Sequence, residues 1–335
     1  MLPAILRETN KTEQQRNQKF CSFSENKRQM QAIAEKNTFK QIKSPLNYIG
    51  GKYKLLEQIL PLFPKKINTF VDLFAGGCNV GLNVTANKII CNDNLKYLVE
   101  MYQEFQKYSV SEILQHLDNQ INKFDLSLTN EVGYKKLREH YNQHKNPLDL
   151  FVLVAFSFNH QIRFNNSHEF NNPFGRERSS FNDTMRANLI QFIQKIHTTN
   201  IQFTCLDFSQ FDFSHLTEND FVYCDPPYLI SLGTYNDGKR GFTGWNETQE
   251  YKLLAVLESL HQRNIKFALS NVLEHKGKEN DILKNWLNKN NYLKINYLRA
   301  DYSNSNYQTL VKEKNTSTEV LITNYEPLKP ATLSD

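Results

Sequence analysis

The sequence predicts an α/β fold built on a mostly parallel, doubly wound sheet. From Pro45 onward, short apolar runs alternate with amphipathic stretches of helical spacing, which is typical of repeated strand-helix units. The chain has 335 residues, more than a usual single core of about 100 to 200 residues. The alternation fails between about residues 106 and 195, where only helical patterns occur. We therefore expect one α/β domain that carries a large helical insertion.

The predicted elements follow from the period of the apolar residues. Six apolar runs read as strands, at residues 69–74, 88–93, 201–208, 220–225, 265–271 and 317–325. Outside the insertion, helical spacing is found at residues 51–60, 94–105, 247–262 and 280–289. Inside it, the predicted helices are residues 109–124, 134–143, 147–158 and 183–196. An insertion of about 90 residues is large enough to pack as a subdomain.

The predicted domain organisation has four parts. A basic, polar N-terminal extension covers residues 1–43, and its nine Lys and Arg against four Asp and Glu account for the whole net charge of +5. Both a solvated tail and a DNA-binding arm are compatible with this composition. The α/β domain comprises residues 44–105 and 196–328, the helical domain residues 106–195 and a tail residues 329–335.

Cysteine spacing and apolar run lengths exclude several classes of protein. The cysteines, whose spacing is never CxxC, are Cys21, Cys78, Cys91, Cys205 and Cys224. This pattern argues against a disulfide framework or a cysteine zinc site, so we expect buried, reduced thiols and no metal. The longest internal apolar run, residues 151–156, is only six residues long. We therefore expect no membrane span and a cytoplasmic protein.

A glycine turn after the first predicted strand indicates a ligand site. Five of the twelve glycines occur in residues 50–51 and 76–81, and the second group directly follows the strand that ends near Asp72. Such a turn lets the backbone approach a ligand at the carboxyl edge of a sheet, although the spacing is not G-x-G-x-x-G. Asp93 ends the next strand, a position where a carboxylate commonly binds ribose hydroxyls. An aspartate at this position could also act as the N-cap of the helix that follows.

The second candidate site is the sequence Asp225-Pro226-Pro227-Tyr228. It follows the strand at residues 220–225, and its chance occurrence in a chain of this length is on the order of one in a thousand. A turn alone needs neither the acid nor the tyrosine. Transfer of a group to an exocyclic aromatic amine does need an acid and a ring, because the lone pair of such an amine is delocalised into its ring and the amine is a poor nucleophile. The Asp225 carboxylate and the Pro226 carbonyl can each accept one amino hydrogen, and Tyr228 offers a stacking face for a flipped base.

These motifs together resemble a known family. The segments LNYIGGK (46–52), FVDLFAGGCNVG (70–81), ND (92–93), DF (207–208) and DPPY (225–228), in this order, are similar to Dam-like, alpha-class DNA adenine-N6 methyltransferases, a type found among type II restriction-modification methylases. The resemblance runs from about Pro45 to Pro327. It implies a Rossmann-like class I S-adenosylmethionine-dependent sheet, with a target-recognition insert that contains FNHQIRFNNSHEFNNPFGR (158–176).

The resemblance also implies residue roles. It implies methyl transfer from S-adenosylmethionine to a flipped adenine, with Asp225, Pro226, Pro227 and Tyr228 as the catalytic set and no covalent enzyme intermediate. The implied cofactor-binding residues are Tyr48, Gly50, Gly51, Lys52, Asp72, Phe74, Gly76, Gly77, Asp93, Asp207, Phe208 and Asp225. The implied DNA-binding residues are Asn159, Gln161, Arg163, Asn165, Pro173, Arg176, Lys239 and Arg240, among which Arg suits guanine and Asn or Gln suits adenine.

The expected function is therefore site-specific adenine-N6 methylation of double-stranded DNA. A GATC-like target is favoured, with CATG or another tetranucleotide as alternatives, and a cognate restriction endonuclease is an expected partner. Two other enzyme classes stay open. An RNA methyltransferase could share the cofactor strand and the Asp-Pro-Pro motif, and a DNA cytosine-N4 methyltransferase uses the same amine chemistry but usually has Ser in place of Asp225.

Overall fold

The computed structural model describes residues 41–231, 244–299 and 317–327, and the structural statements below concern these ranges. The chain divides into two compact units, residues 1–41 and residues 42–335. All the elements described here belong to the second unit. Most of the predicted N-terminal extension, and the tail at residues 329–335, lie outside the described residues.

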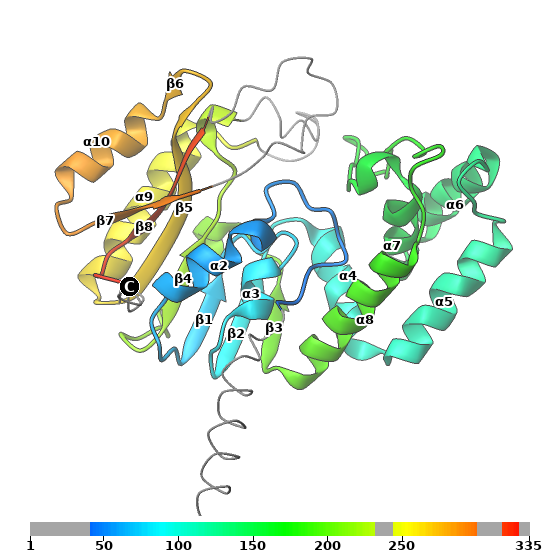
Figure 1. Ribbon diagram of the computed structural model, residues 1–335, viewed down its shortest axis with the longest axis horizontal. Coiled ribbons are helices and arrows are strands. Elements are labelled where there is room, and N and C mark those ends of the chain that lie inside the picture. Colours follow the sequence, from blue (N-terminus) through cyan, green and yellow to red (C-terminus); the bar gives the residue numbers. More distant parts are fainter. Residues whose placement is uncertain (1–40, 232–243, 300–316, 328–335) are drawn as a thin grey trace, which may run out of the picture. The chain divides into compact units, whose positions relative to one another are not determined.

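The second unit is built on an eight-stranded sheet (Figure 1). The strand order is β3-β2-β1-β4-β5-β8-β7, and β6 pairs with β5. Strands β1 to β5 are parallel along this path, whereas β8 is antiparallel to both β5 and β7. The strands are β1 (Thr69–Asp72), β2 (Lys88–Asn92), β3 (Ile201–Thr204), β4 (Phe221–Cys224), β5 (Lys266–His275), β6 (Lys278–Glu279), β7 (Lys294–Leu298) and β8 (Ser317–Thr323).

The centre of the sheet lies at β1 and β4, where the winding direction reverses. From β1 the chain proceeds to β2 and β3 on one side, and then returns to place β4 and β5 on the other. Val71 of β1 pairs with Ile90 of β2 and with Val222 of β4. Because every residue of β1 and β4 is buried, both strands are nearly continuous apolar runs. In such sheets ligands bind at the carboxyl ends of the strands that flank the reversal.

Two hydrophobic clusters cover the two faces of the sheet. Phe70, Phe221 and Tyr223 belong to one cluster, which also contains residues of α2, α3 and α4. Val71 and Val222 belong to the other, together with residues of α9 and α10. The helical elements that flank the sheet are η1 (Lys52–Leu55), α2 (Leu56–Ile59), η2 (Leu60–Leu62), α3 (Asn79–Asn83), α4 (Lys96–Lys107), η4 (Phe208–Gln210), η5 (Leu229–Ser231), α9 (Glu247–Gln262) and α10 (Asp281–Lys289).

The segment predicted as an insertion contains helices and no strand of the sheet within its described residues. Its elements are α5 (Val110–Lys123), α6 (Glu131–His144), α7 (Pro147–Phe156), η3 (Phe158–His160) and α8 (Asp183–Thr198). Residues 148–156 of α7 are all buried, because α7 packs against α4, α5 and α6. Figure 1 shows α5 to α8 grouped together beside the β3 end of the sheet. The domain boundaries themselves stay a prediction.

Between α7 and α8 the chain folds back on itself in a narrow loop. Two isolated bridges join its arms, Ser157 to Phe174 and Phe164 to Phe170. Asn172 lies between the arms, where its side-chain amide donates to the carbonyls of Phe158 and Gln161. We call residues 157–174 the insert hairpin.

The doubly wound α/β fold is confirmed, and the structure corrects three details of the sequence prediction. Strands β6 and β7 were missed, because β6 has only two residues and most residues of β7 are exposed. The predicted helix at residues 51–60 is split into η1, α2 and η2, and η2 contains Pro61, which cannot donate a helical hydrogen bond.

The prediction of buried thiols is wrong for one cysteine. Cys78, Cys91 and Cys224 are buried and free, but Cys205 is exposed. Cys205 follows the last residue of β3, which is an edge strand and so leaves this position open to solvent. Cys21 lies outside the described residues.

Candidate active site

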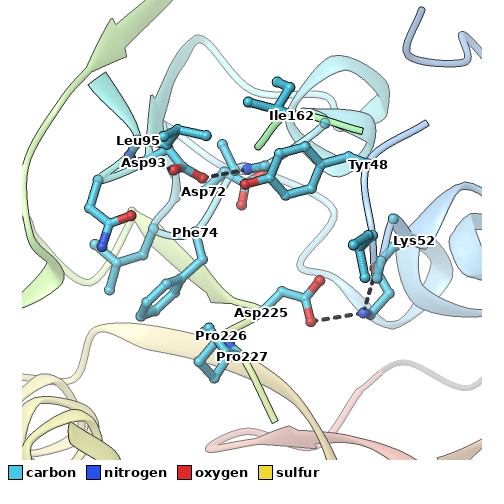
Figure 2. A pocket seen from close by; sticks show the side chains of 18 of the residues that line it. Tyr48, Lys52, Asp72, Phe74, Asp93, Leu95, Ile162, Asp225, Pro226 and Pro227 are labelled. Atoms are coloured by element: carbon cyan, nitrogen blue, oxygen red, sulfur yellow. Dashed lines mark hydrogen bonds and ion pairs between the residues drawn. The ribbon is translucent and has the colours of Figure 1, made fainter. Parts of the chain in front are cut away.

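A cavity of about 270 Å³ lies at the carboxyl ends of β1, β2 and β4. Its walls come from regions that are far apart in the sequence. They are residues 46–52, 72–80, 93–95, 206–208, 223–227 and 244–249, together with residues 160–164 of the insert hairpin. The cavity is lined by every residue of the predicted cofactor set, namely Tyr48, Gly50, Gly51, Lys52, Asp72, Phe74, Gly76, Gly77, Asp93, Asp207, Phe208 and Asp225. Figure 2 shows how the labelled members of this set face one another.

The glycine turn after β1 forms the floor between two strand ends. Ala75 N–H donates to the carbonyl of Asn92 at 2.8 Å, which ties the turn to β2. Gly76 has φ +46, and a Cβ atom there would lie 2.8 Å from two ring carbons of Tyr48. Both the left-handed backbone and the close ring therefore require glycine. The backbone and the Tyr48 ring consequently lie in close contact at the edge of the cavity.

Asp93 supports this turn and also lines the cavity. One carboxylate oxygen accepts from Gly76 N–H at 2.8 Å, and the other accepts from Leu95 N–H at 2.9 Å, just before α4. Burial raises the pKa of Asp93, and these two backbone donors oppose the shift. The expected capping role is wrong, because the N-cap of α4 is Leu95 and this helix has no side-chain cap; Asp93 instead stabilises the turn before α4 and lines the cavity.

Asp72 is a buried carboxyl group at the end of β1, only 1% exposed. Its Oδ2 accepts from Gly81 N–H at 3.2 Å, whereas Oδ1 has no hydrogen-bond partner among the described residues. Burial, followed by the charge of Asp225, raises the pKa of Asp72 to about 8. An orphaned acceptor of this kind in a cavity wall suits a ligand that carries positive charge or a donor group.

Asp225 follows β4 and lies opposite Asp72 in the cavity. Its Oδ1 is 2.8 Å from Lys52 Nζ, and it accepts a hydrogen bond from the Tyr228 hydroxyl at 3.2 Å. Burial raises the pKa of Asp225, and the charge of Lys52 is the largest opposing influence. Pro226 and Pro227 line the cavity, but Tyr228 does not. Tyr228 is buried behind it, with Lys52 Nζ 5.0 Å from its ring centre.

Three aromatic rings form one side of the cavity. Phe74, Phe208 and Trp245 contact one another pairwise, with ring centres 5.4 to 5.6 Å apart. The indole N–H of Trp245 donates to the buried carboxylate of Glu250 at 2.6 Å, which holds the ring in place. Asp207 lies beside Phe208, and its Oδ1 caps η4 by accepting from Ser209 N–H.

Sequence reasoning did not single out Trp245 as a cavity residue. No pattern marked it, because its role depends on Phe74 and Phe208, which lie on other elements. The other tryptophan, Trp286, lies in the hydrophobic core with 6% of its surface exposed, and its indole N–H donates to Glu258. Other lining residues that the sequence did not single out are Leu95, His160, Ile162, Phe164 and Leu206.

The predicted DNA-binding residues are distributed along the insert hairpin and just beyond it. Gln161 lines the cavity, whereas Arg163 and Pro173 are exposed outside it. Asn159 is exposed with a left-handed backbone at φ 55, and its carbonyl accepts from the Asn47 side chain at 3.2 Å. This contact joins the hairpin to the segment that carries Tyr48.

Two other members of the set have partners within the protein. The Asn165 side chain accepts from the N–H groups of Ser167 and Glu169, so it stabilises the hairpin tip. Arg176 is exposed and forms a 2.7 Å ion pair with Glu131. Lys239 and Arg240 lie outside the described residues.

Residues 48–326 match the family of D12 class N6 adenine-specific DNA methyltransferases. The chain is 55% identical over 307 residues to modification methylase StsI of Streptococcus sanguinis, a match covering 91% of this chain and 46% of the relative. It is 53% identical over 293 residues to type II methyltransferase M.FokI of Planomicrobium okeanokoites, covering 88% and 44%. The chain thus spans slightly less than half the length of these relatives.

A more distant similarity covers most of a shorter protein. The DNA adenine methylase of Escherichia coli K12 is 29% identical over 232 residues, which are 68% of this chain and 79% of that protein. No helix among the described residues is long and apolar enough to span a membrane.

Proposed function

The chain belongs to the D12 class of N6 adenine-specific DNA methyltransferases, and we propose that it methylates adenine in a short site of double-stranded DNA with S-adenosylmethionine as the donor. The observation that carries this proposal is the position of Asp225-Pro226-Pro227 in the wall of the cavity that the glycine turn and Asp93 also line. A single cavity of this composition can hold the donor and the accepting amine side by side.

The residues of the cavity fit S-adenosylmethionine. The donor carries a positively charged sulfur and an amino group, and the cavity offers three carboxyl groups, from Asp72, Asp93 and Asp225. The orphaned Oδ1 of Asp72 suits a cationic or hydrogen-bond-donating group, and Asp93 suits ribose hydroxyls. Phe74 and Phe208, together with Trp245, provide ring faces for an adenine. Side chains at Gly76 and Gly77 would collide with Tyr48, so these glycines allow the Tyr48 ring to keep its place in the cavity wall.

Transfer needs an amine whose lone pair is directed at the methyl group. When bound, S-adenosylmethionine supplies that methyl group as an electrophile on sulfur. Asp225 and the Pro226 carbonyl each accept one amino hydrogen of the target adenine, which favours a pyramidal nitrogen. Pro227 fixes the Pro226 carbonyl, because the rings restrict the backbone. Positioning and electrostatics supply most of the acceleration, with no covalent intermediate on the enzyme.

Tyr228 is proposed to stack on the flipped adenine. In the described structure its ring is 6% exposed and lies against Lys52, so it must rotate or become uncovered when the base enters. Base entry is therefore expected to change the surroundings of Tyr228, and quenching or chemical protection of this tyrosine on DNA binding would report it.

We further propose that residues 106–195 form the target-recognition domain, and residues 44–105 and 196–328 the catalytic domain. Arg163 is exposed on the insert hairpin, which leaves it accessible for its proposed base-reading role. To contact DNA, the side chains of Asn165 and Arg176 would have to give up their present partners within the protein. The names of the relatives StsI and M.FokI as modification or type II methylases support a role in restriction-modification, with a cognate endonuclease acting on the same site.

Methyl transfer from tritiated S-adenosylmethionine to duplex DNA and to structured RNA tests the proposed activity. We expect label in DNA only, recovered as N6-methyl-2′-deoxyadenosine after digestion to nucleosides. Asp225→Ala should abolish transfer and leave donor binding largely intact. Label in RNA alone, methylcytosine in the digest, or full turnover by Asp225→Ala would each contradict the proposal. Single-molecule sequencing of DNA from a host that expresses the chain would identify the target and separate GATC from CATG and other sites.

A further inference from the structure

Lys52 is among the most buried charged side chains near the cavity, with a side-chain exposure of 4%. Lysine is almost never fully buried unless its charge has a partner. Its ammonium group is 2.8 Å from Asp225 Oδ1 and donates to the Gly50 carbonyl at 2.9 Å. The ring of Tyr228 lies on a further side, 5.0 Å away. Every one of these partners belongs to the two motifs that form the site.

The backbone of residues 48–52 places the lysine there. Gly51 N–H donates to the Tyr48 carbonyl at 3.1 Å, which closes a tight turn, and Gly50 has φ +75. Lys52 is the first residue of η1, so the turn directs its side chain back toward the strand ends. The dashed lines in Figure 2 mark the two contacts of the ammonium group.

The two bonds to the carboxylate of Asp225 use the same oxygen. Both Lys52 and the Tyr228 hydroxyl are bonded to Oδ1. Figure 2 shows the other carboxylate oxygen pointing into the space between Asp225 and Tyr48. Lys52 and Tyr228 therefore hold one carboxylate oxygen, while the other faces the space where an amine would bind.

We propose that Lys52 is a positioning residue for methyl transfer, which acts by keeping Asp225 ionised and by holding its carboxylate in one orientation for the adenine amine. This inference rests on the proposed function. It gives Lys52 a role in the transfer step besides lining the donor cavity.

The charges around Asp225 explain why such a residue is needed. Burial favours the neutral form of this carboxyl group, and the charge of Lys52 is the largest influence that opposes it. Without a cation, Asp225 would take up a proton more readily. The titratable groups of the neighbouring elements are Lys52, Asp72, Tyr223, Cys224 and Tyr228. Lys52 alone among them brings a positive charge.

The protonation state of Asp225 matters because the amine must donate to it. In the balanced step the N6 lone pair forms the new N–C bond, the S–C pair stays on sulfur as a neutral thioether, and N6 loses one proton afterwards. A protonated Asp225 would present a donor to the amine and compete for its lone pair. A misoriented carboxylate would leave one amino hydrogen without an acceptor.

Substitution of Lys52 by methionine tests the proposal, with K54M as the matched control. Lys54 is exposed in the same short helix. We expect K52M to lower the single-turnover rate at saturating DNA and S-adenosylmethionine on the order of 100-fold. Donor affinity should change less than about 3-fold. The acid limb of the pH-rate profile should move up by about one to three pH units. K54M should change none of these quantities, and K52R should recover part of the rate.

An NMR titration of Asp225 tests the role of Lys52 independently of the methyl-transfer assay. The carboxyl carbon is labelled in the full chain and assigned with D225N. We expect a higher midpoint for Asp225 in K52M than in wild type, and K52Q replaces K52M if the latter does not fold. An unchanged midpoint overturns the inference, as does a wild-type midpoint above pH 7. If wild-type protein methylates no DNA, the proposed function fails, and the titration still decides whether Lys52 controls Asp225.

Discussion

Replacing Asp72 with asparagine should make the fold more stable at neutral pH. Asp72 is 1% exposed, and its pKa is raised from 3.8 to about 8, first by burial and then by the charge of Asp225. Between about pH 4 and pH 8 the folded protein therefore holds a proton that the unfolded chain releases. The free energy of unfolding falls as the pH rises through this window, and the dependence flattens above it.

The size of the effect follows from the pKa difference. Each pH unit between the two values contributes about 1.4 kcal/mol, so at pH 7 the wild-type fold has lost about 4 kcal/mol relative to pH below 4. Asparagine removes this loss. Its carbonyl keeps the bond from Gly81 N–H, but its NH₂ group replaces the orphaned Oδ1 and lacks an acceptor. This unsatisfied donor costs about 1–3 kcal/mol, so the unfolding free energy of D72N should exceed that of wild type by about 1–3 kcal/mol at pH 7.

Denaturant unfolding of both proteins from pH 5 to pH 9 measures the effect. The difference in unfolding free energy, D72N minus wild type, should rise by about 1.4 kcal/mol per pH unit up to about pH 8. The control is D183N, which alters an exposed carboxylate at the start of α8 and should show a constant difference. A difference for D72N that does not depend on pH would refute the reasoning.

Two further substitutions test the walls of the cavity. Gly76→Ala should lower the unfolding free energy by about 1–2 kcal/mol through its left-handed backbone and weaken donor binding by displacing Tyr48, as measured by calorimetry. Gly277→Ala is the control: its backbone is also left-handed, but an added Cβ would have no atom within 4 Å. Equal loss of donor affinity in both variants would argue against the Tyr48 contact. Trp245→Ala should weaken donor binding by about 10-fold, whereas Trp286→Ala should reduce stability alone. If Trp245→Ala binds the donor as tightly as wild type, Trp245 is not part of the donor site.

Much of the fold followed from local sequence patterns. β1 and β4 were predictable because strands buried on both faces are continuous apolar runs, and helices such as α9 show regular apolar spacing. β7 was not recognised because most of its residues are exposed at a sheet edge, where burial places little demand on the sequence. The position of β8 between β5 and β7 also came from the structure, since the partners and direction of a strand leave no mark on its own sequence.

The DNA-reading residues show where residue type alone stops being informative. Arg163 and Arg176 have the same side chain, but one is exposed without a described ion pair and the other pairs with Glu131. Asn165 could read a base by its chemistry, yet its side chain is bonded within the hairpin tip. These distinctions depend on neighbours brought together by folding, so the roles of these residues stay predictions.

The sequence by itself determined the chemistry that the two motifs can offer, because a carboxylate, a proline carbonyl and glycine turns have properties that do not depend on the rest of the chain. Tertiary structure alone decided how these groups affect one another. Lys52 and Asp225 are far apart in the sequence and 2.8 Å apart in space. Trp245 meets Phe74 only because α9 begins, and β1 ends, at the same cavity. Burial and charge act over a few ångströms, so the ionisation of Asp72 and Asp225 belongs to the folded arrangement.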